Sequence, residues 1–174
     1  TKDGKPFEII KFRSMIVDAE KVGGAQLAKA NDSRITPVGR FIRSTRIDEL
    51  PQLLNIIKGD MSFVGPRPER PEIMEEYMEN IPEFAFRLRV KAGLTGFAQI
   101  YGKYNTIPYD KLKLDLFYIE NYSVWLDIKL ILMTVKTILK KDSTEGISSD
   151  QTTAAKEETS SNVMDVVNEI KNRK

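Results

Sequence analysis

Two helical patterns meet at a pair of adjacent acids in RFIRSTRIDELPQLLNIIKGD, residues 40–60. The first pattern begins near Thr36 and Pro37, a good N-cap followed by the residue best tolerated at the first helical position. The second places apolar residues at the i, i+3, i+4, i+7 spacing of one helix face: Leu50, Leu53, Leu54 and Ile57. Gly59 suits its end, because glycine readily adopts the left-handed backbone that closes many helices. The sequence therefore predicts two consecutive helices with the acids at their junction.

Short strands and helices alternate along the rest of the chain. Strands are expected at residues 7–15, which are rich in Ile and Phe, and at the start of the proline-containing segment 62–72. Helical patterns cover residues 18–30, 71–89 with a break near Pro82, 109–120 and 124–140. Residues 92–102 predict a glycine-punctuated strand or loop. The expected fold class is α+β, a mostly helical single domain with a few short strands.

Composition separates this domain, residues 1–142, from the remainder of the chain. Residues 143–161 are polar and rich in Ser and Thr, which predicts a flexible linker. Residues 162–174 carry valines and an isoleucine at helical spacing, which predicts a short amphipathic helix. At the other end, the opening TKDGKPFEIIKF reads like the second strand of a hairpin, so we expect further residues upstream of Thr1.

The absence of cysteine and histidine from the sequence excludes several kinds of chemistry. Disulfides, Cys/His zinc sites, thiolate nucleophiles and histidine-based triads all need these residues. Catalysis would have to use carboxylates, hydroxyls, Lys, Arg, Tyr or a metal held by oxygen, for which Mg²⁺ is the natural choice. The formal net charge of +2 gives no reason to expect nucleic-acid binding.

The adjacent acids Asp48 and Glu49 admit two interpretations. In one, Asp48 caps the second helix, Glu49 favours its first turn and Pro51 is tolerated there. In the other, a carboxylate attacks a phosphate held by arginines. The charge pattern favours the second, because seven basic residues stand against four acids between Arg34 and Arg70. Arginines bind phosphate through a planar fork and should keep Asp48 ionised, as a nucleophile or metal ligand must be.

Other cations stand where an anion would bind. Prolines on both sides of Arg67 restrict the backbone, which fits either a surface turn or a pre-organised anion contact. In KFRSM, Lys11 and Arg13 would share one strand face, which fits either a solvated edge strand or an anion held between two cations.

The helix expected at residues 124–140 is strongly amphipathic. One stripe holds Trp125, Ile128, Leu132, Val135 and Leu139, with lysines near its edges. We favour packing of this stripe in the core. A membrane interface is the alternative, because Trp and Lys suit the boundary between acyl chains and anionic headgroups. No run reaches the ~18 apolar residues that a spanning helix needs.

Four separated motifs stand in order within residues 3–141: KFRSM, IDELPQLLNIIKGDMSFVGPRPE, KAGLTGFAQIYGK and LDLFYIENYSVWLDIKLILMT. Together they resemble the bacterial sugar transferase family, the monotopic phosphoglycosyl transferases that start polysaccharide and glycoconjugate synthesis. The resemblance implies a membrane-associated catalytic domain at the cytoplasmic face of the bacterial inner membrane, with an N-terminal re-entrant helix absent from this chain. It also implies transfer of a sugar 1-phosphate from a nucleotide diphosphosugar, commonly a UDP-sugar, to polyprenyl phosphate, with Mg²⁺ as cofactor.

The same resemblance implies roles for individual residues. Asp48 would be the nucleophile that forms a phosphosugar–aspartyl intermediate, Glu49 would complete the acidic pair, and both would serve the metal. Phosphate and nucleotide contacts would come from Lys11, Arg43, Arg67 and Gln99. Arg13, beside Lys11 on the expected strand, joins the substrate-binding set. Whether the chain forms a homo-oligomer is left open.

Two other functions are open at this point. A non-enzymatic module would bind anions or membrane lipid through the basic face and leave the acids as caps. An aspartyl-phosphate hydrolase would use the same acids but transfer the phosphoryl group to water, so its products would differ.

Overall fold

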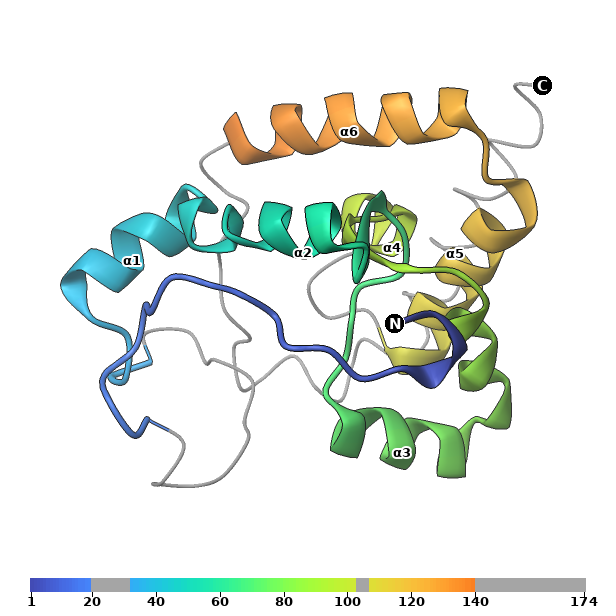
Figure 1. The fold of residues 1–174 in the computed structure, drawn as a ribbon, viewed down its shortest axis with the longest axis horizontal. Coiled ribbons are helices and arrows are strands. Elements are labelled where there is room, and N and C mark those ends of the chain that lie inside the picture. Colours follow the sequence, from blue (N-terminus) through green and yellow to red (C-terminus); the bar gives the residue numbers. More distant parts are fainter. Residues whose placement is uncertain (20–31, 103–106, 140–174) are drawn as a thin grey trace.

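The computed structural model describes residues 1–19, 32–102 and 107–139 (Figure 1). Its helices are α1 (Pro37–Ser44), α2 (Gln52–Lys58), α3 (Pro71–Asn80), α4 (Phe97–Tyr101), α5 (Pro108–Asn121) and α6 (Val124–Leu139). The 3₁₀ segments are η1 (Lys2–Gly4), η2 (Ile47–Glu49) and η3 (Pro82–Arg89), and the strands are β1 (Met61–Val64) and β2 (Ala92–Thr95). This confirms the expected mostly helical fold with a few short strands. The predictions for residues 20–30 and 143–174 lie outside the described residues.

The two strands lie side by side and run parallel. The chain between them forms α3 and η3, which is the kind of crossover that a parallel pair needs. Val64 pairs with Thr95 at the end of the ladder, and the next amide, Gly65 N–H, donates to the Thr95 carbonyl at 2.9 Å. The strand pair therefore fixes where the proline-containing loop 65–70 begins.

The core lies between the strands and helices α4, α5 and α6. Its main cluster of buried residues consists of Val64, Phe97, Ala98, Leu114, Phe117, Tyr118 and Leu130. The ring centroids of Phe97 and Phe117 are 5.0 Å apart, a spacing typical of favourable aromatic pairs. The Tyr118 hydroxyl also donates to the Asp127 carboxylate at 2.8 Å, which ties α5 to α6. Apolar packing and side-chain hydrogen bonds thus hold α6 on the domain.

Local signals located most of the helix ends correctly. Thr36 caps α1, because its hydroxyl accepts a hydrogen bond from Gly39 N–H at 2.9 Å. Gly59 ends α2 with a φ of 86°, and the break expected near Pro82 separates α3 from η3. The helices expected at residues 109–120 and 124–140 are α5 and α6.

The strand expected at residues 7–15 is wrong. All of these residues are described, yet only Met15 forms a bridge, an antiparallel one with Ile35. The Phe12 N–H instead donates to the Asp48 carbonyl at 3.1 Å. Alternating apolar residues predict an extended backbone, but a strand also needs a neighbouring strand to complete its ladder. Here the Asp48 carbonyl, in the turn η2, accepts the hydrogen bond of the Phe12 amide in place of a neighbouring strand.

The apolar stripes of α2 and α6 face solvent in the described structure. Ile57 on α2 is 81% exposed, and the prediction that the α6 stripe packs in the core is wrong, since Trp125 is 78% and Leu132 66% exposed. Other faces of these helices meet the domain, through Asn55 on α2 and Leu130 on α6. A helical period identifies a face but not the neighbour it meets. Within the described ranges, no helix is both long enough and apolar enough to cross a bilayer.

Gly93 marks a very close approach between β2 and the start of loop 65–70. A Cβ atom there would stand 2.1 Å from the Gly65 nitrogen and 2.4 Å from the Thr95 oxygen. Gly93→Ala is therefore expected to lower the free energy of unfolding by about 1–3 kcal/mol, the usual cost of overpacking, in urea denaturation. Exposed Ala85 is the control, and Ala85→Ser should change this free energy by less than about 0.5 kcal/mol. An unchanged midpoint for Gly93→Ala would contradict the packing described.

Candidate active site

The acid pair lies in η2, the single 3₁₀ turn between α1 and α2. Arg46, just before the pair, has a φ of 57°, a left-handed conformation that is uncommon for a residue other than glycine. Helix α2 begins at Gln52 with Pro51 as its N-cap, so the prediction that Asp48 caps this helix is wrong. Because the 3₁₀ turn places Asp48 ahead of α2, the side chain of Asp48 does not cap this helix.

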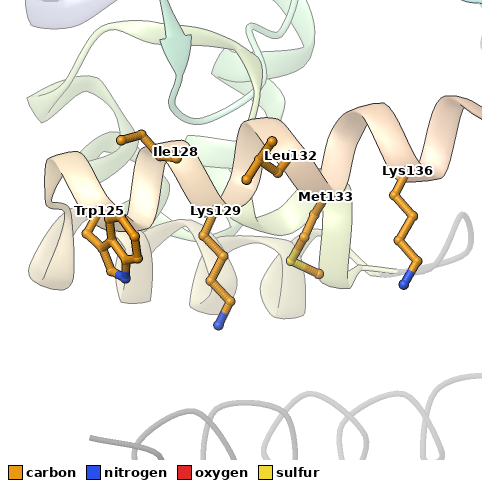
Figure 2. Close-up of a pocket in the computed structure, with 6 residues that line it drawn as sticks. All are labelled: Trp125, Ile128, Lys129, Leu132, Met133 and Lys136. Carbon is orange, nitrogen blue, oxygen red and sulfur yellow. The ribbon is translucent and has the colours of Figure 1, made fainter.

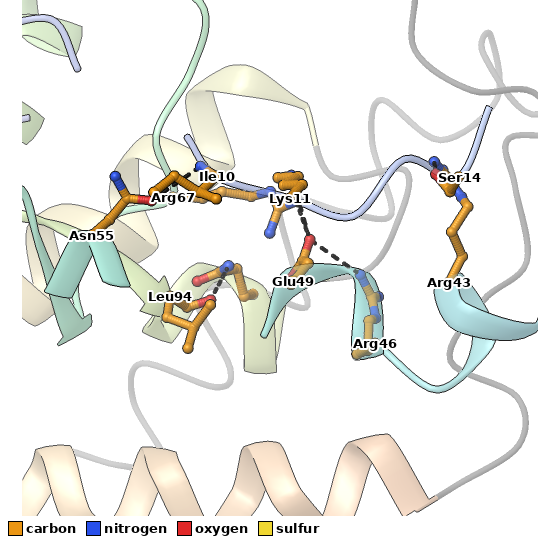
Figure 3. A network of polar contacts seen from close by, with 10 residues as sticks. Ile10, Lys11, Ser14, Arg43, Arg46, Glu49, Asn55, Arg67 and Leu94 are labelled. Carbon is orange, nitrogen blue, oxygen red and sulfur yellow. Dashed lines mark hydrogen bonds and ion pairs between the residues drawn. The ribbon is translucent and has the colours of Figure 1, made fainter. Parts of the chain in front are cut away.

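Helix α2 holds residues 8–10 beside this turn. Asn55, only 1% exposed, accepts a hydrogen bond from Ile10 N–H at 3.0 Å through its side-chain oxygen. The amide nitrogen of the same side chain donates to the carbonyl of Glu8 at 2.8 Å. Lys11 follows directly in the chain and lies beside Glu49, as Figure 3 shows. A buried side chain far along the sequence thus positions the first cation of the site.

Three cations converge on one oxygen of Glu49 (Figure 3). The distances to its Oε1 are 2.9 Å from Arg67 Nη2, 3.7 Å from Lys11 Nζ and 4.0 Å from Arg46 Nη1. Burial by itself would raise the pKa of Glu49, but the charge and hydrogen bond of Arg67, with Lys11 assisting, hold that pKa below its ordinary value. Glu49 is therefore ionised at neutral pH and acts as the fixed counter-ion of Arg67.

Asp48 has the opposite character, although it is the next residue. Its side chain is buried, and its Oδ1 has no hydrogen-bond partner. Burial raises the pKa of Asp48 above its ordinary value, and the charge of Glu49 raises it further. Arg43 and Lys11 lower the pKa without cancelling these effects. The arginines alone therefore do not determine the protonation state of Asp48. The site presents a desolvated carboxyl oxygen of Asp48 close to cations.

The remaining phosphate-binding candidates Lys11, Arg43 and Arg67 all lie around the acids. Burial lowers the pKa of Lys11, and the positive charge of Arg67 lowers it further. The Arg43 guanidinium donates to the Ser14 hydroxyl at 3.4 Å while its charge acts on Asp48. An incoming anion would offset the repulsion between these neighbouring positive charges.

Two predicted residues are not joined to this cluster. Arg13 is exposed and, among the described residues, makes no hydrogen bond or ion pair with either acid. It lines a separate surface depression with residues 14–19. Gln99 lies on α4, where its side-chain nitrogen donates to the Leu94 carbonyl at 3.3 Å and its buried oxygen has no partner.

The donor atoms fit Mg²⁺ only in the company of a phosphate. The unpartnered Oδ1 of Asp48 is a hard oxygen donor, and Glu49 supplies a second carboxylate. In the described part of the chain, however, no three acidic residues gather closely enough to hold a metal by themselves. Mg²⁺ commonly binds one or two carboxylates together with substrate phosphates and water. Asp48 and Glu49 therefore suit a metal ion that is shared with a bound diphosphate.

Sequence reasoning missed two residues around the site, Arg87 and Asp115. It counts Arg46, two residues before Asp48, among the basic residues near the acids but gives it no individual role. Arg87 and Asp115 form a buried ion pair at 2.7 Å behind the loop that carries Arg67. A signal for Asp115 was available, because a lone acid on an apolar helical stretch, LKLDLFY, needs a partner when buried.

A family model described as bacterial sugar transferase matches residues 1–141. The chain belongs to the bacterial sugar transferase family. The match covers the acid pair, the cations around it and every helix and strand that the structure describes.

Curated members of this family are similar to the chain over most of its length. One is a UDP-N-acetylgalactosamine-undecaprenyl-phosphate N-acetylgalactosaminephosphotransferase of Aeromonas hydrophila, 43% identical over 141 residues that cover 79% of this chain and 33% of the relative. An undecaprenyl-phosphate galactose phosphotransferase of Salmonella typhimurium is 40% identical, covering 81% and 32%. A UDP-glucose:undecaprenyl-phosphate glucose-1-phosphate transferase of Caulobacter vibrioides is 42% identical, covering 80% and 54%. The chain thus spans about a third of the first two relatives and about half of the third.

In this sugar transferase family member, the two acids should affect stability with opposite signs. The pKa of Glu49 is lower in the folded than in the unfolded chain, so its carboxylate stabilises the fold at neutral pH. That contribution is lost as the pH falls below about 4, through the folded-state pKa. Glu49→Gln should therefore lower the free energy of unfolding at neutral pH and flatten its loss on acidification, in urea titrations with EDTA present.

Asp48→Asn is the matched variant with the opposite expectation. The pKa of Asp48 is raised in the fold, so its ionisation opposes folding as the pH rises through the unfolded-state value. The variant should unfold at higher urea concentration than the wild type at neutral pH. A lower midpoint for Asp48→Asn, or an unchanged one for Glu49→Gln, would contradict the assigned charge states.

Proposed function

We propose that this chain is the catalytic domain of a phosphoglycosyl transferase that moves a sugar 1-phosphate from a nucleotide diphosphosugar, expected to be a UDP-sugar, to undecaprenyl phosphate. The observation that carries the proposal is the buried, unpartnered Oδ1 of Asp48 beside Glu49, in the field of nearby cations. The relatives are named for undecaprenyl phosphate, which supports that lipid as the acceptor. Those names differ in the sugar, so no sugar is assigned.

In the proposed first step, a carboxylate oxygen of Asp48 attacks the phosphorus that carries the sugar. A bond forms between this oxygen and phosphorus, the bond to the bridging oxygen breaks, and the nucleoside monophosphate leaves with the bonding electron pair. In the second step, an oxygen of undecaprenyl phosphate attacks the same phosphorus and the Asp48 carboxylate leaves. Both nucleophiles are anions, so neither displacement needs a general base.

The central obstacle is repulsion between an anionic nucleophile and an anionic diphosphate. Lys11, Arg43 and Arg67 lie where they offset this repulsion, and such pre-placed charges need no reorganisation during the reaction. Glu49 fixes Arg67 at 2.9 Å, so the guanidinium is held before the substrate arrives. Burial also keeps Asp48 more basic than an ordinary carboxylate, which favours it as a nucleophile.

Asp48 and Glu49 would hold Mg²⁺ together with the donor diphosphate. When bound, the metal supplies further positive charge that polarises the phosphoryl oxygens. The protein's own contribution is to present two carboxylates of different character, Glu49 with its Oε1 engaged by three cations and Asp48 with an unpartnered Oδ1.

Exposed apolar side chains support a membrane surface as the place of the reaction. Figure 2 shows a pocket along α6 lined by Trp125, Ile128, Lys129, Leu132, Met133 and Lys136, all of them exposed except the half-buried Met133. Leu50, directly after the acid pair, is also exposed, as is Ile57 further along the same stretch. Apolar side chains of this kind enter the acyl boundary while lysines meet anionic headgroups. We propose the cytoplasmic face of the bacterial inner membrane, where nucleotide sugars are available.

Asp48→Asn should abolish transfer in the full-length, membrane-embedded protein. Because the amide cannot form the covalent intermediate, turnover of a panel of UDP-sugars with undecaprenyl phosphate should fall at least about 1,000-fold. The measurement is mass-spectrometric detection of the lipid diphosphosugar and the nucleoside monophosphate. Exposed Glu72 is the control, and Glu72→Gln should retain activity.

Two outcomes would contradict the proposal. Unchanged turnover by Asp48→Asn would remove the nucleophile from its role. Release of free sugar phosphate in the absence of undecaprenyl phosphate, at the rate seen in its presence, would identify a hydrolase instead.

The membrane surface is tested separately on the 174-residue chain. Ile57→Glu and Trp125→Glu should each weaken flotation with vesicles of phosphatidylglycerol and phosphatidylethanolamine at least about tenfold, given ~0.8 kcal/mol per buried CH₂. Phe86 on η3 is an exposed aromatic outside these helices, and Phe86→Glu is the control. Equal binding by all three variants would contradict docking through α2 and α6.

A further inference from the structure

The buried guanidinium of Arg87 holds the loop that carries Arg67. Its Nε donates to Asp115 Oδ2 at 2.7 Å, and its Nη2 donates to the main-chain carbonyl of Arg67 at 2.9 Å. Its Nη1 lies 3.9 Å from Glu69 Oε1. Arg87 is 4% exposed and is not among the groups paired with the acid pair. One planar side chain thus joins η3, α5 and the loop.

Helix α5 supplies a second attachment for the same loop. Lys111 Nζ lies 2.8 Å from Glu69 Oε1, and Glu69 is only 15% exposed. From the strand side, Gly93 N–H donates to the Pro66 carbonyl at 2.9 Å. We refer to Arg87, Asp115 and Lys111 as the loop clamp.

The backbone chemistry of the loop explains why a side-chain clamp is needed. Pro66 and Pro68 flank Arg67 and have no N–H group, so they cannot fasten the loop through their own amides. The carbonyl groups of the loop remain available as attachment points, and Gly93 and Arg87 bind two successive ones, those of Pro66 and Arg67. With its main chain held in this way, Arg67 reaches Glu49 at 2.9 Å.

Stability alone is a poor explanation for the Arg87–Asp115 pair. Buried ion pairs are often no more stable than apolar residues of similar volume, because both charges lose water. Here the pair is incomplete as well, since Asp115 Oδ1 is buried without a hydrogen-bond partner. What arginine does and an apolar side chain cannot do is bind a carboxylate and a carbonyl at once through one rigid fork.

We propose that Arg87 is a positioning residue, which sets the place of the Arg67 guanidinium over the acid pair by holding the Arg67 carbonyl, with Asp115 and Lys111 completing the clamp. The effect on turnover rests on the function proposed above, but the effect on Arg67 itself does not. Arg87→Lys keeps a positive charge but loses the fork. Arg87→Lys should therefore change the position of the Arg67 guanidinium while the domain still folds.

The first test is a double-mutant cycle in the full-length membrane protein. Arg87→Lys should lower kcat/KM for UDP-sugar transfer to undecaprenyl phosphate by roughly 10-fold to 100-fold, as misplacement of a substrate-positioning group does. In an Arg67→Ala background, the same substitution should lower it less than about twofold, because the group being positioned is gone. Equal losses in both backgrounds would overturn the proposal and leave Arg87 a purely structural role.

The matched control is Arg89, two residues further along η3. Arg89 is exposed and stacks on the Phe86 ring, and within the described part of the chain it forms no hydrogen bond or ion pair with loop 65–70. Arg89→Lys should retain kcat/KM in both backgrounds. A loss for Arg89→Lys as large as that for Arg87→Lys would also overturn the assignment.

The second test does not depend on turnover. Arg67 should react several-fold faster with phenylglyoxal in Arg87→Lys than in the wild type or Arg89→Lys, as read by peptide mass spectrometry. If Arg87→Lys fails to fold by circular dichroism, Lys111→Gln takes its place, because Lys111 is 30% exposed and its loss leaves the buried pair intact. Unchanged Arg67 labelling in the folded variant would overturn the clamp. Increased labelling in a protein that transfers no sugar would support the clamp and refute the proposed function alone.

Discussion

The ion pair between Glu49 and Arg67 joins the turn between α1 and α2 to the loop that follows β1. At 2.9 Å, it brings a guanidinium beside the two adjacent carboxylates and completes a set of three cations around one oxygen of Glu49. Asp48 is then the acid whose buried oxygen has no partner. One contact thus gives neighbouring residues different tasks, and the charge distribution of the whole site follows from it.

The features that suit this site to phosphoryl chemistry also cost stability. A buried carboxyl oxygen without a partner is unfavourable, and so are apolar stripes such as the one ending at Ile57 that face water. Both make sense if the domain works on a lipid phosphate. Under the proposed function, the diphosphate would meet the desolvated oxygen of Asp48, and the apolar side chains would meet the membrane. The core around Leu114 and Phe97 carries the stability that the site gives up.

Local chemistry in the sequence located helices well and contacts less well. The Thr36 cap, the Gly59 end and the break near Pro82 follow from backbone preferences, and the structure confirms them. The strand at residues 7–15 was wrong, because alternation does not supply a pairing partner. The exposed stripe containing Trp125 shows the same limit, since helical periodicity predicts which residues share a face but not whether that face packs on the domain or meets solvent. The order of the motifs correctly predicted that Lys11, Arg43 and Arg67 lie near the acids. The partners of Arg87 are 20 and 28 residues away in the sequence, so no local pattern could predict these contacts.

The central claim is that Asp48 becomes covalently attached to the sugar phosphate. The most direct measurement is acid quenching of the full-length protein with a UDP-sugar and no acceptor, followed by proteolysis and mass spectrometry. We expect the mass of one sugar phosphate on Asp48, and its disappearance when undecaprenyl phosphate is added before the quench. Active enzyme that carries no adduct, or that carries it on Glu49 or elsewhere, would contradict this claim.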